Sequence, residues 1–184
     1  MTVAVVLVMR CLVTASLLTT TLLASASVAS AGTYVSLGLG GTPSPQGTLK
    51  IAASTGSSDV EQRRAGLGFS FGQLAIEATA ARYALGSGHA TAVGVHARLG
   101  IPIDGGFGAY ARVGVERAWL TDLAPRLGDR ADGMVGGVGL EYRLRAPLLG
   151  QAAIWAEVSQ DQLTFADDSK GGARMWTLGA SIGF

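Results

Sequence analysis

Apolar and polar residues alternate with a period of two along most of this chain. Such alternation sends successive side chains to opposite faces of a β-strand. Several of the alternating segments are longer than the ~5–6 residues of an ordinary soluble strand, as strands that cross a membrane at a tilt would be. About eight strands are expected, at residues 33–40, 63–71, 73–84, 89–101, 107–120, 131–145, 151–164 and 173–184, and residues 47–55 could extend the first hairpin.

The connections between these strands alternate in length. Gly, Pro, Ser and Asp are frequent in them, as turns require. Short turns on one side and longer loops on the other are typical of outer-membrane barrels. The short connections are 71–73, 102–106 and 146–150, the longer ones are 41–62, 121–130 and 165–172, and 85–88 is short although it belongs with the long set.

The two faces of the expected strands differ in chemistry. One face carries single small aliphatic residues and no charge, as in Val93, Val95 and Ala97. The opposite face mixes glycine with long polar or aromatic side chains, as in Gly94 and His96. A soluble barrel or sandwich would turn the apolar face inward, whereas a membrane barrel would turn it to lipid and enclose the polar face.

Three features favour the membrane arrangement. Glycine on a solvent-exposed strand face weakens the strand without benefit, but in a narrow lumen it leaves room for long side chains. The apolar face consists mainly of small aliphatic side chains, which would fill the core of a soluble protein poorly. Aromatic residues lie near the strand ends on that face, and at a tilt of ~40° the gaps from Phe107 to Trp119 and from Trp176 to Phe184 span roughly 30 and 20 Å, close to an apolar band of ~25 Å. The sequence therefore predicts an all-β fold, a single closed antiparallel transmembrane β-barrel.

Residues 1–31 are interpreted as a signal peptide that is removed on export. Residues 12–23 are apolar, and Ala29-Ser30-Ala31 has the small-residue pattern of a signal peptidase site. Cleavage after Ala31 leaves residues 32–184 as one barrel domain. The expected positive charge is Arg10, which lies far into the chain and suggests Met9 as the true start. The alternative, a membrane-anchoring helix, is disfavoured because the stretch is short for a span.

Removing that segment balances the charge, because Arg10 is one of 14 Lys and Arg residues against 13 Asp and Glu. A net charge near zero argues against nucleic acid as a partner. The single cysteine, Cys11, lies in the signal peptide, so the mature chain is expected to be stable without disulfides. The two histidines, His89 and His96, are separated and have no cysteine beside them, so they make no zinc motif. No cofactor is expected.

The last strand ends on an aromatic residue, which is unusual because chain ends are normally frayed and polar. It resembles the closing strand of bacterial outer-membrane β-barrels. Residues 32–184 as a whole resemble the small eight-stranded group that includes the membrane domain of outer-membrane protein A and the OmpX-type proteins. The resemblance implies a Gram-negative-type outer membrane, with its lipid and lipopolysaccharide and the barrel assembly machinery as partners. It also implies a terminal assembly signal at Trp176, Leu178, Ile182 and Phe184.

The charged residues of the polar face are expected to fill the lumen. An eight-stranded barrel has an interior just wide enough for side chains, and buried charges are costly unless they are paired and hydrogen-bonded. The prediction is an ion-pair network of Glu77, Arg98, Arg112, Glu141, Arg143 and Glu157, with Tyr34, His96 and Tyr110 as hydrogen-bonding members. The alternative is a gated pore, in which one ion pair of the network separates and opens the lumen.

Other motifs are weak. Gly66-Leu67-Gly68 and Gly38-Leu39-Gly40-Gly41 lie within alternating strands and open no helix, so they do not indicate a nucleotide site. Aspartates in residues 122–132 and at 167–168 could bind calcium weakly, but their spacing matches no defined loop. Lipid A deacylases and palmitoyl transferases use this architecture, yet His89-Ala90-Thr91 near one rim is an incomplete set for such chemistry.

The leading interpretation is a non-enzymatic integral outer-membrane protein. Its role would be envelope structure or surface interaction through the loops at residues 41–62 and 121–130. A pore for small solutes is the alternative, and a lipid A-modifying enzyme is a third and weaker one.

Overall fold

The computed structural model describes residues 32–41, 43–49, 62–85, 88–122, 128–146 and 150–183. These residues form a sequence of β-strands joined by turns, with one short 3₁₀ turn, η1 (Asp104–Gly106). The strands are β1 (Gly32–Gly40), β2 (Ser44–Gly47), β3 (Gln62–Phe71), β4 (Leu74–Leu85), β5 (Gly88–Pro102), β6 (Phe107–Thr121), β7 (Arg130–Ala146), β8 (Gly150–Phe165) and β9 (Lys170–Gly183).

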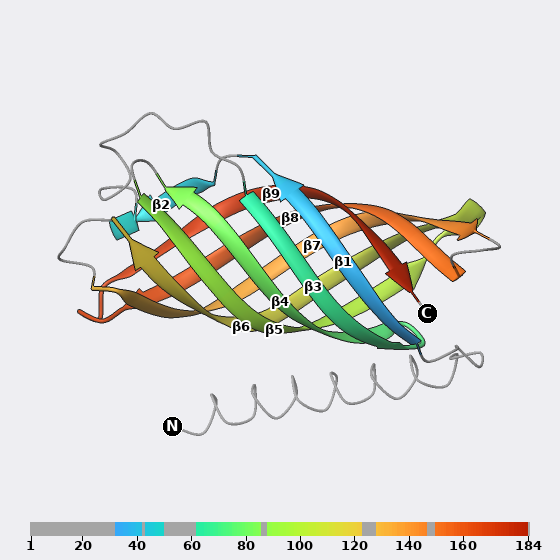
Figure 1. Ribbon diagram of the computed structural model, residues 1–184, viewed down its shortest axis with the longest axis horizontal. Helices are drawn as coiled ribbons and strands as arrows, with labels where there is room; N and C mark the ends of the chain where they lie inside the picture. The colour runs from blue at the N-terminus through green and yellow to red at the C-terminus, as the bar shows by residue number, and fades with distance from the viewer. Residues whose placement is uncertain are drawn as a thin grey trace, which may run out of the picture.

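The strands close into a barrel (Figure 1). From β3 to β9 each strand pairs antiparallel with the next, and β1 pairs with both β3 and β9. The short strand β2 continues the line of β1 along β9, since Gly40 lies opposite Thr177 and Ser44 lies opposite Arg174. β1 and β2 thus fill one position, and the barrel is eight-stranded. Closure satisfies the edge groups that an open sheet would leave unpaired.

Each strand expected from the sequence coincides with an observed one, and the largest difference at a boundary is at β9, which begins at Lys170 rather than at residue 173. The predicted all-β barrel is confirmed. The suggested extension at residues 47–55 differs, because β2 ends at Gly47 and pairs with β9 rather than lengthening the hairpin with β3; residues 50–55 lie outside the described residues. The expected signal peptide, residues 1–31, also lies outside them. Within the described ranges, no helix has the length and apolar character needed to cross a membrane.

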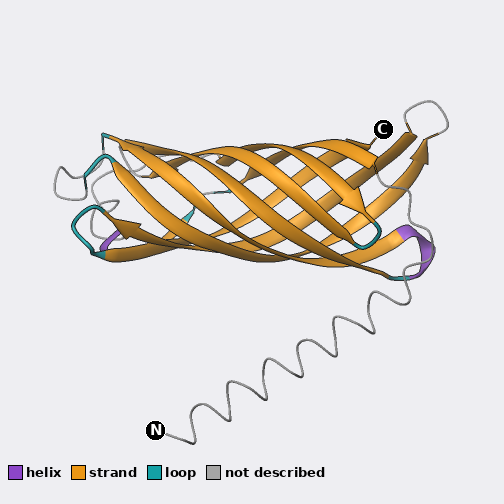
Figure 2. Ribbon diagram, turned by 90° about the horizontal axis from the view of Figure 1, so that it is seen from below, coloured by secondary structure: helices purple, strands orange, loops and turns teal. Residues whose placement is uncertain are grey.

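The two ends of the barrel differ (Figure 2). One end, here called the turn end, carries the β3–β4, β5–β6 and β7–β8 connections together with the start of β1 and the end of β9. The other, the loop end, carries β2 and the β4–β5, β6–β7 and β8–β9 connections. The η1 turn belongs to the turn end, where Gly105 and Gly106 adopt positive φ angles of 69° and 87° that suit glycine.

Over the turn end and the middle of the barrel, apolar side chains point out and polar side chains point in. Leu37 on β1 is 67% exposed and Val138 on β7 is 65% exposed, whereas His96 and Glu157 are buried. This is the reverse of a soluble barrel, whose interior would hold the aliphatic side chains. The alternation of period two determines the arrangement, because a shift of one residue would exchange the two faces.

At the loop end the polarity reverses, unlike the uniformly polar interior expected from the sequence. The interior there is filled by an apolar plug of Leu49, Ala81, Tyr83, Ala90, Ala92, Ala118, Leu120, Ala131, Leu163, Phe165, Ala173 and Met175. The outward positions of the same strand segments are mostly polar, with Trp119 and Met134 as exposed apolar residues among them. We call their polar residues the polar collar: Arg63, Arg82, Arg117, Arg130, Asp132, Gln160, Gln162, Thr164, Lys170 and Arg174. The loop end therefore combines an apolar interior with a mostly polar outer surface.

Candidate functional site

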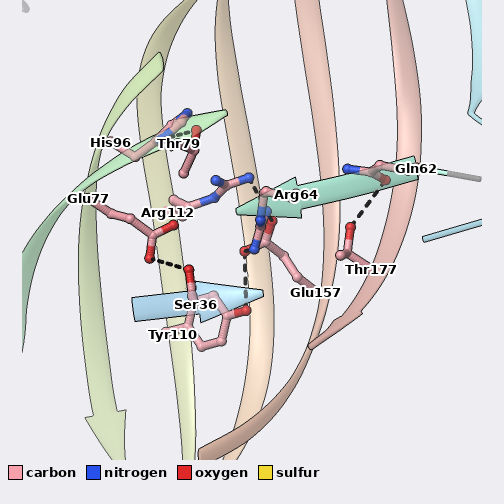
Figure 3. A network of polar contacts seen from close by, with 10 residues as sticks. All are labelled: Ser36, Gln62, Arg64, Glu77, Thr79, His96, Tyr110, Arg112, Glu157 and Thr177. Atoms are coloured by element: carbon pink, nitrogen blue, oxygen red, sulfur yellow. Dashed lines mark hydrogen bonds and ion pairs between the residues drawn. The ribbon is translucent and has the colours of Figure 1, made fainter. Parts of the chain in front are cut away.

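Glu157 on β8 is the centre of the polar interior (Figure 3). Its Oε1 accepts hydrogen bonds from Nη1 of Arg64 and from Nη2 of Arg112, each at 2.7 Å. The hydroxyl of Tyr110 donates to Oε2 at 3.1 Å. All three side chains of this ion-pair cluster are buried. One carboxylate thus holds two guanidinium groups that come from strands on different sides of the barrel.

Aromatic rings complete the surroundings of the guanidinium groups. The guanidinium carbon of Arg64 lies 4.5 Å from the ring centroid of Trp155, and that of Arg98 lies 3.8 Å from the ring centroid of Tyr110. A cation over an aromatic face is attracted by the ring quadrupole, and the attraction is stronger away from water. These stacked rings compensate part of the lost hydration of the buried cations.

A second ion-pair cluster lies nearer the turn end. Glu141 on β7 accepts from Nη2 of Arg98, and its Oε1 also accepts from Nε of Arg143 at 2.7 Å. The side chain of Arg143 is 51% exposed, so this cluster reaches the mouth of the barrel. Water screens the Arg143 pair more than it screens the Glu157 cluster.

The remaining polar side chains of the interior make weaker or local contacts. Ser36 donates to Glu77 at 3.5 Å, and Thr79 lies 3.3 Å from Nδ1 of His96. Toward the loop end, Thr177 donates to Gln62 at 3.2 Å. These bonds join neighbouring or facing strands at several levels of the interior.

Glycines make the room that the long side chains need. A Cβ on Gly68 would overlap the ring of Tyr34, and a Cβ on Gly139 would overlap the ring of Tyr110. Gly179 lies in the same way against Trp155. Bare backbone opposite a bulky ring is what the mixed glycine and aromatic face of the sequence predicted.

Little free space remains among these groups. The cavity between the two clusters, which Tyr34, Glu77, Arg98 and Glu157 help to line, has a volume of about 10 Å³. That is about the room for a single water molecule. Together with the apolar plug, it leaves the interior filled along the part that the structure describes.

The structure brings five of the six charged residues of the expected network into direct ion pairs: Arg98 and Arg143 with Glu141, and Arg112 with Glu157. Glu77 is buried in the same layer, with Ser36 as its hydrogen-bond donor. Of the aromatic members, Tyr110 bonds Glu157, and His96 bonds Thr79. Tyr34 is buried over Gly68 beside the cavity.

Three charged residues of the interior were missing from the expected network. Arg64 follows the same alternation as Gly66 and Gly68, so the period of two contained its signal. Glu116 and Asp161 belong to the polar face, but nothing in the spacing along the chain reveals that they meet. Both are buried, their carboxyl groups interact with each other, and each keeps one buried oxygen without a hydrogen-bond partner.

Other candidate chemistry finds no site in the described residues. Gly66-Leu67-Gly68 lies within β3 and Gly38 lies within β1, so neither opens a phosphate-binding loop. No group of three or more His, Cys, Asp or Glu side chains among the described residues is arranged to hold a metal ion. In the β8–β9 turn, the backbone amide of Ser169 donates to Asp167 at 3.0 Å, and hydrogen bonds from Ser169 hold the pKa of Asp167 below its ordinary value.

No protein-family model and no curated protein sequence matches the chain. Solved structures do resemble it. Neisserial surface protein A is 16% identical, with a TM-score of 0.61 over 85% of this chain and 100% of that chain. The N-terminal β-barrel domain of Pseudomonas aeruginosa OprF is 15% identical, with a TM-score of 0.53 over 83% and 99% of the two chains. A designed transmembrane β-barrel is 12% identical, with a TM-score of 0.52 over 86% and 100%. These likenesses show that the chain has the fold of the small eight-stranded outer-membrane β-barrels.

Proposed function

We propose that this chain is a non-enzymatic integral protein of a bacterial outer membrane, with the turn end toward the periplasm and the loop end outward. The observation that carries the proposal is the belt of exposed aliphatic side chains around a buried ionic interior. Large apolar side chains such as Leu37, Leu67, Val115 and Val138 are more than half exposed. Monomeric soluble proteins rarely expose contiguous apolar patches of this kind, whereas a bilayer covers them.

The barrel is proposed to be closed to solutes, so that its role is structural or lies in surface interaction at the loop end. A water-sized cavity of about 10 Å³ between the ion-pair clusters supports this, as does the apolar plug beyond them. A pore would need a continuous polar path, and the plug interrupts it. The loops at residues 41–62 and 121–130 remain the proposed surface for partners, although most of their residues lie outside the described ranges.

Insertion by the barrel assembly machinery is part of the same proposal. Trp176, Leu178 and Ile182 face outward from β9, where a partner that reads the closing strand could reach them. Phe184, the fourth residue of the expected assembly signal, lies outside the described residues.

The test is to refold residues 32–184 into phospholipid bilayers and to measure two properties. A shift in gel mobility between unheated and heated samples reports barrel formation, and planar-bilayer recording reports conduction. The proposal expects a heat-modifiable barrel without a well-defined open channel. A large, stable unitary conductance would overturn the closed lumen, and a protein that stays folded and monodisperse in plain buffer would overturn the membrane placement.

A further inference from the structure

The outward positions of the strands change character between the two ends of the barrel. On β8, Ile154, Ala156 and Val158 are followed toward the loop end by Gln160, Gln162 and Thr164. On β9, Trp176 and Leu178 are preceded at the loop end by Lys170 and Arg174. The turn end shows no comparable change, because its outward positions stay mostly apolar to the strand ends, as at Phe71, Ile101 and Ile182, with Thr33 on β1 as an exception. A polar lateral surface therefore exists at one end alone of the described barrel.

The charges of this polar collar are unbalanced. Its cations are Arg63, Arg82, Arg117, Arg130, Lys170 and Arg174, and its single acid is Asp132. Asp132 accepts from Nε of Arg117 at 2.6 Å, which neutralises that pair. Next to the collar, Asp129 lies 4.0 Å from Arg130. The collar still carries an excess of positive charge, which attracts anions.

A groove of about 630 Å³ opens in this collar over β2, β7, β8 and β9. Its lining includes Gly171 and Gly172, which have no side chains, and two acids, the exposed Asp132 and the buried Asp161. Gln46 on β2 and Gln162 on β8 lie opposite Gly172 on its two sides, so amide groups flank this glycine. At one end of the groove, Lys170 on β9 lies opposite Thr164 on β8, and Thr164 lies opposite Asp132 on β7.

The position of the groove relative to the aromatic girdle identifies the layer that it meets. Arg174 is one outward position beyond Trp176 on β9, a step of ~5 Å along the axis at a tilt of ~40°. Aromatic girdles mark the interface between the apolar band and the polar headgroups. Arg174 and the groove beside it therefore lie at the level of headgroups and face sideways, toward neighbouring lipids.

We propose that this groove binds the phosphorylated sugar headgroup of an outer-leaflet glycolipid, a proposal that rests on the outer-membrane placement proposed above. Lys170 and Arg174 suit phosphate oxygens, which form strong charge-assisted hydrogen bonds with such groups. The amides of Gln46 and Gln162 and the hydroxyl of Thr164 suit sugar hydroxyls, because each both donates and accepts. The other collar arginines extend the cationic surface around the barrel to further lipids.

The test uses residues 32–184 refolded into phosphatidylcholine nanodiscs, with bisphosphorylated lipid A or its dephosphorylated form added. Native mass spectrometry measures the lipid A that stays bound. The unmodified barrel is expected to retain the bisphosphorylated form preferentially. Each cation near an anionic surface contributes an attraction that corresponds to roughly fivefold in affinity. Lys170→Gln is thus expected to weaken binding about fivefold, and Lys170→Gln with Arg174→Gln about 25-fold.

A matched variant in the same groove should change lipid binding in the opposite direction. Asp132→Asn removes the single acid of the collar and the partner of Arg117, so it is expected to strengthen the binding of the bisphosphorylated form. Equal retention of the two lipid A forms, or equal binding by the unmodified and the Lys170/Arg174 double variant, would overturn the headgroup site while leaving a membrane barrel intact. That result would make the collar a solvated rim. Failure of the unmodified chain to give a heat-modifiable barrel in the nanodisc would instead overturn the proposed function, and the headgroup site with it.

Discussion

Glu157→Gln tests the ion-pair cluster of the interior most sharply. The variant keeps the size of the side chain but leaves Arg64 and Arg112 without their shared anion. Both donor atoms lie 2.7 Å from Oε1 of Glu157, and their side chains are 5% exposed. At ~4 Å between charge centres and an effective dielectric constant of ~20, each pair contributes about 4 kcal/mol of gross attraction. Removing one partner of a buried pair lowers the free energy of unfolding by about 3–5 kcal/mol, and this range is expected for Glu157→Gln.

The opposite change should be milder. Arg112→Met leaves Glu157 paired with Arg64, and it removes a buried charge altogether. A buried carboxylate that loses a cationic partner can become neutral by taking up a proton, whereas a guanidinium remains charged at every accessible pH. We therefore expect Arg112→Met to lower the free energy of unfolding less than Glu157→Gln does.

The measurement is a reversible denaturant titration of the refolded barrel in phospholipid, with the heat-modifiable gel shift reporting the folded fraction. Asp132→Asn is the matched control, because it also removes one carboxylate from an Arg–Asp pair, but that pair is exposed and should contribute little to stability. Equal stability of Glu157→Gln and the unmodified protein, or a larger loss from Arg112→Met, would refute the reasoning.

Three further changes have definite expected outcomes. Gly139→Ala should lower the free energy of unfolding by about 1–3 kcal/mol, because a Cβ there overlaps the Tyr110 ring, whereas Gly136→Ala on the same strand meets nothing within 4 Å and should be neutral in the same denaturant titration. The Ser169 amide, followed by NMR against pH, should titrate with a midpoint below ~3.9, because its hydrogen bond favours the charged form of Asp167. The stability that this bond adds to the turn is full above the unfolded pKa of Asp167 and is lost as the pH falls through the lowered folded pKa. A midpoint at or above ~3.9 would contradict this prediction. Phe184→Ala should reduce the amount of barrel assembled in cells while leaving refolding in detergent unchanged, and equal loss in both would show a purely structural role.

Most of the fold could be predicted from alternation alone. The strict period of two fixes which residues share a face, and turn residues fix where strands end, so β3 to β8 were placed within a residue at each end. The short strand β2 was missed because two prolines, Pro43 and Pro45, weaken its strand signal. Its pairing with β9 depends on closure of the barrel, which spacing along the chain does not encode.

The interior was predictable by face but not by partner. The alternation along each strand assigned Glu141, Glu157 and Arg112 to the lumen. Which acid pairs with which base, however, depends on the stagger of the strands around the barrel. Arg64 and Glu157 are 93 residues apart in sequence and meet across the lumen. The reversal of polarity at the loop end was missed for another reason. The period of two continues there, but the apolar positions shift by one residue, on β8 from Ile154, Ala156 and Val158 to Leu163 and Phe165.

The natural tryptophans test the central claim most directly. Trp155 is buried against Arg64, whereas Trp119 and Trp176 are exposed on the outward face. In variants that keep one tryptophan each, with phenylalanine at the other two positions, fluorescence is measured in bilayers of brominated lipid. Strong quenching of Trp119 and Trp176 with little quenching of Trp155 is the expected result. Strong quenching of Trp155 with protection of the other two would show that the aliphatic face is enclosed and that the ionic face is the outer one.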